Sequence, residues 1–282
     1  SVAGANTYVW NTTDITSAIT VSPSSATTYS VTGTDVNGCT GTASSSVAVN
    51  PLPTVSVNPV SPAICNGDNT TVTASGATSY VWSNAANTAV ITVAPGTTTS
   101  YSVTGTDANG CTGTSSATVN VNPLPTVIIN PISPAICVGA SATLTAGGAT
   151  NYLWSNAGST AAITVFPATT SSYTVTGTDV NGCTGTAVAA VTVNTLPTVS
   201  VNPASPAICN GGSTTLTATG ATSYVWSNAA NTTAITVAPN TTTTYSVTGT
   251  DANSCSAAAT SVVTVNPLPT VSINPVSPAI CN

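Results

Sequence analysis

The sequence predicts an all-β protein: a linear array of small antiparallel β-sandwich domains joined by short linkers that contain proline. The first observation is a repeat. The motif TGTDVNGCTGT at 32–42 returns with small changes at 104–114, 176–186 and 248–258, each time 72 residues further on. The second is the alternation of apolar and polar residues within each copy, which is typical of half-buried strands and shows no helical period. A fixed period of this kind indicates a series of similar structural units.

The repeat sets the expected domain boundaries. Residues 1–10 align with 73–82, so the first copy begins inside a strand and only part of it lies within 1–53. Residues 270–282 align with the start of a copy and predict the first strand of a fifth repeat. Both ends are therefore expected to cut through a longer chain. Three complete copies lie between them, at 54–125, 126–197 and 198–269.

One complete copy, 54–125, shows how each strand is predicted. The first strand contains Pro59 and Pro62, and a strand tolerates proline only at a sheet edge or a bulge. A turn from Asp107 to Gly110 joins the last two strands, because Asn-Gly accepts the positive φ of a hairpin. The expected strands are 54–65, 70–76, 79–84, 89–93, 101–107 and 111–121. Short antiparallel strands in this number form a β-sandwich.

Aromatic residues at the third strand of each copy, such as Tyr80 and Trp82, are expected to fill the domain cores. The expected core aromatics are Trp10, Trp82, Trp154, Trp226, Tyr29, Tyr101, Tyr173 and Tyr245. The alternative is that the Tyr and Trp of this strand form an exposed platform on which a sugar stacks. If the rings face inward, the aliphatic residue between them faces outward and offers a spot for lateral packing of chains. These residues are Val9, Val81, Leu153 and Val225.

A short linker follows the last strand of each copy. It reads NPLP at 50–53, 122–125 and 266–269, and NTLP at 194–197. Two prolines around a leucine predict a stiff joint and not a flexible one. Because the linker is so short, neighbouring domains are expected to abut. The predicted architecture is a row of units whose stability is shared between the units and their junctions.

The composition excludes several classes of function. The chain has no Lys, Arg or His, and its six Asp residues give a formal net charge of −6. Without cations it cannot neutralise phosphates, which excludes nucleic acid as a partner. Without His, Lys, Arg or Glu it lacks a general base and an oxyanion partner, so neither an enzyme nor a cofactor is predicted. No apolar run approaches the roughly 20 residues of a membrane span.

One aspartate begins the last turn of every copy and raises the question of a metal site. The preferred explanation is that the aspartate caps the turn by hydrogen bonding to the nearby backbone. Calcium is the alternative, although calcium sites usually assemble several carboxylates and each copy offers one. The calcium candidates are Asp35, Asp107, Asp179 and Asp251.

Eight cysteines, two in each period, predict disulfides in an oxidising compartment. In a sandwich, Cys65 lies at one end of its domain and Cys111 at the other, farther apart than a disulfide allows. Where domains abut, opposite ends of successive domains meet. This preferred junction pairing gives Cys65–Cys183 and Cys137–Cys255. Pairing within each copy stays open as Cys65–Cys111, Cys137–Cys183 and Cys209–Cys255. A third alternative joins Cys39 to Cys65, and so on along the chain, by folding a first strand onto the preceding domain.

The combined pattern ICNGxxTTxTAxG…SYxWSN…ITV…TTTxYSVTGTDANGC…VTVNPLP resembles the tandem Ig-like or PKD-like repeats of large cell-surface and secreted proteins of Bacteroidota, including gliding-type adhesins. The resemblance extends over all four copies. WSNA stands where PKD domains carry WDFGDG, so the repeats are PKD-like and depart from the PKD signature itself. The resemblance implies Ig-type sandwiches, export, and roles as stalks, adhesins or building blocks of fibres.

Composition, repeats and resemblance together predict a structural segment of an extracellular filament, stalk or adhesin that gives reach and stiffness, with self-association as an added property. The alternatives are a glycan-binding array and a spacer of a larger secreted enzyme. The expected location is extracellular or at the cell surface. Neighbouring repeats of the same chain are the expected partners, with other copies of the filament and surface glycans left open.

Overall fold

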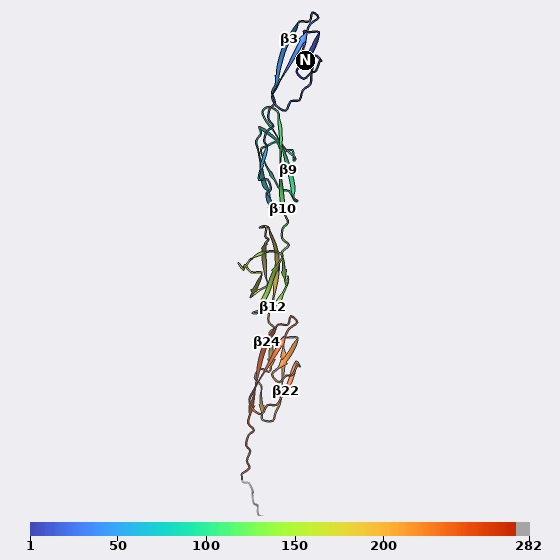
Figure 1. Ribbon diagram of the computed structural model, residues 1–282. Coiled ribbons are helices and arrows are strands. Elements are labelled where there is room, and N and C mark those ends of the chain that lie inside the picture. Colours follow the sequence, from blue (N-terminus) through green and yellow to red (C-terminus); the bar gives the residue numbers. More distant parts are fainter. Residues whose placement is uncertain (275–282) are drawn as a thin grey trace, which may run out of the picture. The chain divides into compact units, whose positions relative to one another are not determined.

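The computed structural model describes residues 1–274, and every regular element in this part of the chain is a β-strand (Figure 1). This confirms the all-β prediction. The chain divides into two compact units, Ser1–Pro123 and Leu124–Asn282. We refer to residues 1–53, 54–125, 126–197 and 198–269 as repeats 1 to 4. Among the residues described, no helix is long and apolar enough to cross a membrane.

Repeat 2, in the first unit, is a sandwich of two sheets. A three-stranded sheet has the order β4-β6-β8, and a four-stranded sheet has the order β5-β10-β9-β7. Strand β4 lies against β10 of the other sheet. The strands of repeat 2 are β4 (Ser56–Asn58), β5 (Ala63–Cys65), β6 (Thr70–Ser75), β7 (Ser79–Trp82), β8 (Val90–Val93), β9 (Thr99–Thr106) and β10 (Thr112–Asn122).

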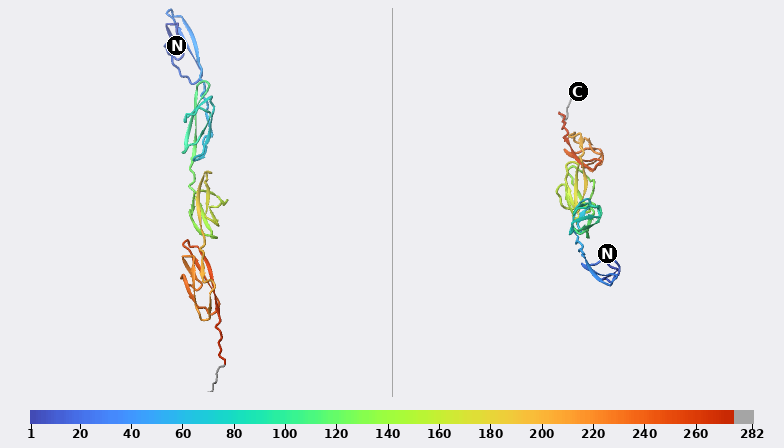
Figure 2. Two further views of the ribbon diagram at one scale, coloured as in Figure 1. Left: turned by 180° about the vertical axis from the view of Figure 1, so that it is seen from behind. Right: turned by 90° about the horizontal axis from the view of Figure 1, so that it is seen from above.

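Repeats 3 and 4, in the second unit, have the same two sheets, and the strands of each repeat run side by side in the views of Figure 2. Repeat 3 contains β11 (Ile128–Asn130), β12 (Ala135–Cys137), β13 (Ala142–Gly147), β14 (Asn151–Trp154), β15 (Ala162–Val165), β16 (Ser171–Thr178) and β17 (Thr184–Asn194). Repeat 4 contains β18 (Ser200–Asn202), β19 (Ala207–Cys209), β20 (Thr214–Thr219), β21 (Ser223–Trp226), β22 (Ala234–Val237), β23 (Thr243–Thr250) and β24 (Ser256–Asn266).

The predicted first strand, 54–65, is wrong in one respect. It forms two short strands, because β4 joins one sheet and β5 joins the other. A cis Asn58–Pro59 peptide bond lies between them. Strand β5 pairs with β10 in parallel, so the sandwich is not purely antiparallel. Both strands are sheet edges, as the prolines predict, since proline cannot donate to a ladder.

Each complete repeat has its own hydrophobic core between the two sheets. In repeat 2 the core includes Val72 and Ala74 from β6, Trp82 from β7 and Val119 from β10. Corresponding clusters fill repeats 3 and 4. The alternation of buried and exposed residues along these strands is the pattern from which the sandwich was predicted.

Repeat 1 is a single sheet, with the order β1-β2-β3. Its strands are β1 (Thr7–Trp10), β2 (Thr27–Thr34) and β3 (Thr40–Val47). They correspond to β7, β9 and β10 of repeat 2, and repeat 1 has no counterpart of the β4-β6-β8 sheet among the residues described. At the other end of the chain, residues 270–274 form no strand, and the remainder of the predicted fifth-repeat strand, 275–282, lies outside the described residues.

Candidate functional site

The turn before the last strand of each repeat is held by its aspartate. In repeat 2, Asp107 Oδ1 accepts hydrogen bonds from the backbone N–H groups of Asn109 at 2.8 Å and Cys111 at 2.9 Å. Asp35, Asp179 and Asp251 cap the equivalent turns in the same way. The capped turn fixes the backbone of the cysteine that directly precedes the last strand.

These aspartates do not gather with other ligands. In residues 1–274, no three His, Cys, Asp or Glu side chains lie close enough together to hold a metal ion. The backbone N–H groups of Cys39 and Asn37 hold the pKa of the exposed Asp35 carboxyl below its ordinary value. Turn capping therefore accounts for the contacts of Asp35, Asp107, Asp179 and Asp251, the four candidates for calcium.

The other cysteine of each complete repeat lies at the opposite end of the sandwich. In repeat 3, Cys137 is the last residue of β12 and pairs with Asn194, the last residue of β17. The next residue, Val138, donates its N–H to the Asn194 carbonyl at 2.9 Å. Because Asn194 begins the linker NTLP, Cys137 lies where the chain leaves repeat 3 for repeat 4.

A disulfide joins Cys137 of repeat 3 to Cys255 of repeat 4, with a Cα–Cα distance of 5.6 Å and a sequence separation of 118 residues. It connects the exit end of one sandwich to the capped turn of the next. The Cys255 side chain is fully buried. Cys65 and Cys183 are also disulfide-bonded. The thiols of Cys39, Cys111 and Cys209 are free.

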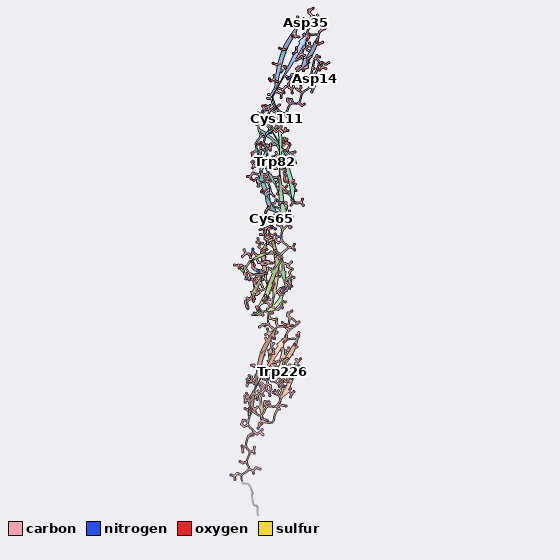
Figure 3. All side chains as sticks on the ribbon, viewed as in Figure 1. Asp14, Asp35, Cys65, Trp82, Cys111 and Trp226 are labelled. Atoms are coloured by element: carbon pink, nitrogen blue, oxygen red, sulfur yellow. A yellow bond between two sulfur atoms is a disulfide. The ribbon has the colours of Figure 1, made fainter. Side chains whose placement is uncertain are left out.

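The other pairings considered from the sequence do not form. Cys137–Cys255 excludes Cys137–Cys183 and Cys209–Cys255, and the free thiol of Cys111 excludes Cys65–Cys111. Figure 3 shows the physical reason, because Cys65 and Cys111 lie at opposite ends of repeat 2 with Trp82 between them. The strand-swapped alternative, Cys39–Cys65, fails because β4 and β5 pair with strands of their own repeat.

The aromatic residues of the third strand are held inside the sandwich. The Trp82 indole is buried, and its Nε1 donates a hydrogen bond to the Thr88 carbonyl at 2.9 Å. The Tyr80 hydroxyl donates to the Ala77 carbonyl at 2.9 Å and accepts from the Ala77 N–H at 3.0 Å. Because Trp82 is buried and Tyr80 is half-buried with its hydroxyl hydrogen-bonded, the two rings do not form an exposed platform on which a sugar could stack.

The other aromatic residues that were predicted to lie in the cores differ in how deeply they are buried. Trp10, Trp154 and Trp226 are buried, as Trp82 is. The tyrosines of the strand paired with it in the sheet are half-buried at the edge of the core: Tyr29, Tyr101, Tyr173 and Tyr245. The residue between the aromatics points outward and is more than half exposed in each repeat: Val9, Val81, Leu153 and Val225.

Two glycines in the TGT-containing hairpins of repeats 2 and 3 have a role that was not predicted from the sequence. A Cβ on Gly105 would lie 2.6 Å from Val55 Cγ2, and one on Gly113 would overlap the Pro53 carbonyl oxygen. These glycines make room for the linker and the start of the first strand. In the Thr-Gly-Thr sequences, glycine and threonine lie on opposite faces of the strand. This pattern was the sequence signal from which a close approach at the glycine could have been predicted. Repeat 4 has Ala257 at the position that corresponds to Gly113.

No family model matches the chain, and no curated protein matches it. Among solved structures, the N-terminal eight Ig domains of Down Syndrome Cell Adhesion Molecule align with 92% of this chain at 13% identity and a TM-score of 0.25. This chain spans 50% of that structure's length.

Two further solved structures resemble the chain. One concerns the host cell surface retention of a 1.5-MDa bacterial ice-binding adhesin, with a TM-score of 0.32 and 16% identity over 77% of this chain and 100% of that one. The other contains the three N-terminal domains of the bacteriophage RB49 Highly Immunogenic Outer Capsid protein, with a TM-score of 0.30 and 16% identity over 77% of this chain and 99% of that one. The likeness concerns the fold, which the paired sheets already establish.

Proposed function

We propose that the chain is a structural segment of an extracellular filament, stalk or adhesin, in which tandem Ig-like sandwiches provide reach and stiffness. The observation that carries the proposal is the Cys137–Cys255 disulfide, which joins consecutive repeats and not two strands of one repeat. A disulfide of this kind is stable in an oxidising compartment, which supports an extracellular or cell-surface location.

The disulfide has a mechanical consequence. When the chain is pulled at its ends, tension that reaches Cys137 crosses the sulfur–sulfur bond to Cys255. The stretch between them contains most of repeat 3, the linker and repeat 4 up to its capped turn. These residues can lose their hydrogen bonds under load, but they cannot be drawn out into extended chain.

The equivalent bond one period earlier, Cys65–Cys183, belongs to the same proposal. Its support is the 72-residue repeat, which places these two cysteines where Cys137 and Cys255 lie in the next copies, and the disulfide-bonded state of both residues. Linkage of every repeat to the next would make the segment a covalently reinforced series.

Single-molecule pulling of the whole chain tests this role. A Cys65→Ser, Cys183→Ser background isolates Cys137–Cys255, and reduction should then lengthen the fully extended molecule by 118 residues, about 400 Å at roughly 3.4 Å per residue. With all cysteines present, the gain on reduction should be larger. An oxidised background variant that extends to the same length as the reduced one would refute the mechanical role.

We also propose that the chains associate with one another by packing side by side. Strand β7 is an edge of its sheet, and Val81 points outward from it without a charged neighbour on the strand. Replacing Val9, Val81, Leu153 and Val225 with serine should reduce any lateral bundling seen by light scattering, while leaving the calorimetric transition unchanged. Bundles that persist in this variant would show that the outward residues are not the contact.

A further inference from the structure

In a complete repeat, three of the four sheet edges are protected. In repeat 2 the edges are β4 and β8 of one sheet and β5 and β7 of the other. Pro59 follows β4 and Pro62 precedes β5, and proline is one of the devices that keep other chains off a sheet edge. On β7, Trp82 donates its N–H to the Ala86 carbonyl and accepts at its own carbonyl from the Ala85 N–H, both at 2.9 Å. The equivalent edges of repeats 3 and 4 are protected in the same way.

Strand β8 is the remaining edge, and its outward backbone groups can be assigned. Ala74 donates its N–H to the Ala89 carbonyl, which makes these two residues a hydrogen-bonded pair at the end of the β6–β8 ladder. Hydrogen-bonded pairs alternate along an antiparallel ladder, so the N–H and C=O groups of Val90 and Thr92 point away from β6. The Thr88 hydroxyl donates to the Val90 carbonyl at 2.7 Å, and this oxygen keeps a second lone pair. Strand β8 therefore presents unpaired backbone groups along its outer edge.

This edge lacks the residues that prevent chains from pairing edge to edge. Residues 88–94 read TAVITVA, residues 160–166 read TAAITVF, and residues 232–238 read TTAITVA, without a proline or a charge. Strands β15 and β22 have the same alternation of exposed and buried residues as β8. Their ladders also begin with the same hydrogen bond, from Ala146 to Ala161 and from Ala218 to Thr233. The open edge is thus a property of every complete repeat.

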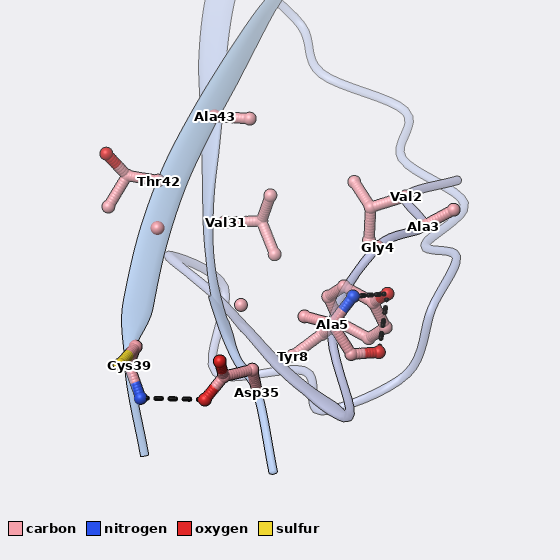
Figure 4. A pocket seen from close by; sticks show the side chains of 12 residues that line it. Val2, Ala3, Gly4, Ala5, Tyr8, Val31, Asp35, Cys39, Thr42 and Ala43 are labelled. Carbon is pink, nitrogen blue, oxygen red and sulfur yellow. Dashed lines mark hydrogen bonds between the residues drawn. The ribbon is translucent and has the colours of Figure 1, made fainter. Parts of the chain in front are cut away.

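The charges of the chain lie away from these edges. None of the six aspartates is in a strand. Figure 4 shows Asp35 in the capped turn of repeat 1, where it accepts a hydrogen bond from the Cys39 N–H, and Asp107, Asp179 and Asp251 occupy the equivalent turns. Because the chain has no lysine or arginine either, two copies can bring these edges together without placing a charge between them.

The length of the edge indicates which partner can use it. Strand β8 has four residues, and so short an edge holds a single partner strand weakly. A partner with several such edges at the same spacing would gain from every contact, because linked weak contacts reinforce one another. A second copy of this chain has that spacing. We infer that strands β8, β15 and β22 of one copy pair in antiparallel fashion with these strands of a second copy, and join the three-stranded sheets of facing repeats into larger sheets.

A two-fold axis gives the register of the contact. With Ile91 opposite Ile91 of the second copy, Val90 of each copy faces Thr92 of the other. Each facing pair then exchanges its outward N–H and C=O groups, as strand addition at a sheet edge requires. The contact uses the same patch on both copies, which is the usual form of a two-fold interface. It differs from the packing through Val81, because backbone groups and not outward side chains make it.

Sedimentation of the whole chain tests the inference, with the free thiols of Cys39, Cys111 and Cys209 alkylated so that no disulfide joins two copies. Association should rise with concentration in multiples of the 27.3 kDa chain mass.

The combined variant Thr92→Pro, Thr164→Pro, Thr236→Pro removes an outward N–H from each edge, a position at which an edge strand tolerates proline. It should weaken association by about tenfold or more, because every contact loses backbone hydrogen bonds. The matched control changes the same residues to serine, which keeps the N–H groups and should associate as the unaltered chain does.

Hydrogen exchange followed by NMR gives a second measurement that needs no substitution. The N–H groups of Thr92, Thr164 and Thr236 should exchange quickly in dilute solution and slowly in concentrated solution. The Ile91 N–H is the internal reference, because the ladder directs it to β6 and its exchange should be slow at both concentrations.

A chain that stays monomeric at every concentration would overturn the inference. So would association that the proline variant retains in full, or threonine N–H groups that exchange equally fast in dilute and concentrated solution. Association that is lost on changing Val9, Val81, Leu153 and Val225 to serine, but kept in the proline variant, would assign the contact to the outward side chains instead. Edge pairing concerns the contact between copies, so its failure would leave the proposed stalk role untouched.

Discussion

Removal of the Cys137–Cys255 disulfide is the perturbation whose size the structure allows to be worked out. The bond closes a loop with a sequence separation of 118 residues, and Cys137→Ser opens it. In the chain-entropy description, a loop of this length stabilises the folded state by about 5 kcal/mol, because the cross-link restricts the unfolded chain. The stabilisation acts on repeats 3 and 4 together, since the loop includes most of both.

Differential scanning calorimetry measures the effect. For two repeats of this combined size, 1 kcal/mol shifts the midpoint by roughly 2–4 °C, so Cys137→Ser should lower the transition of repeats 3 and 4 by about 10–20 °C. Cys209→Ser is the matched control, because Cys209 occupies the same strand-end position in repeat 4 and its thiol is free. A surface change of that kind should alter stability by less than about 0.5 kcal/mol.

The comparison of the two variants decides the outcome. If Cys137→Ser and Cys209→Ser lower the midpoint by the same amount, the loop does not stabilise the folded repeats and the reasoning fails. If Cys137→Ser splits the transition while Cys209→Ser does not, the disulfide also couples the unfolding of the two repeats.

Three smaller changes test the packing and the capped turn. Gly185→Ala should destabilise repeat 3 by about 1–3 kcal/mol in urea unfolding, because the new methyl overlaps the linker carbonyl; Gly41→Ala, which faces open space, should be nearly neutral. Trp154→Ala should cost about 3–5 kcal/mol as a core cavity, whereas the exposed Leu153→Ala should cost under about 0.5 kcal/mol, and equal costs would contradict the assigned faces. The Asp35 carboxyl should titrate by NMR at a lower pH than in the unfolded chain, so its contribution to stability is present above the unfolded pKa and is lost as pH falls through the folded one.

The strands, their inner faces and the core tryptophans could be predicted because they depend on local alternation and on the period. Side chains alternate between the two faces of a strand, so if Trp82 points into the core, Val81 must point outward. The capped turn could be predicted for the same reason, because the hydrogen bonds that join Asp107, Asn109 and Gly110 all lie within one hairpin.

The rest required contacts between distant residues. Nothing in the local pattern around Pro59 shows that β4 and β5 belong to different sheets, because the split depends on where β6 and β10 lie. The disulfide order was left open for a similar reason. Cys137 and Cys255 are 118 residues apart, and only the placement of two whole sandwiches brings them together.

The tetrapeptide Ala-Ile-Thr-Val shows how strongly a strand here depends on its partner. It forms β15 at 162–165 and β22 at 234–237, each paired with the strand before it in the sheet. The same four residues at 18–21 in repeat 1 form no strand, and the described part of repeat 1 contains no counterpart of β13 or β20 with which they could pair. The β-propensity of the segment is identical in all three places, so the ladder and the opposing sheet decide its structure. A strand of these repeats therefore depends on its ladder partner and on the opposing sheet, and its own four residues do not determine whether it forms.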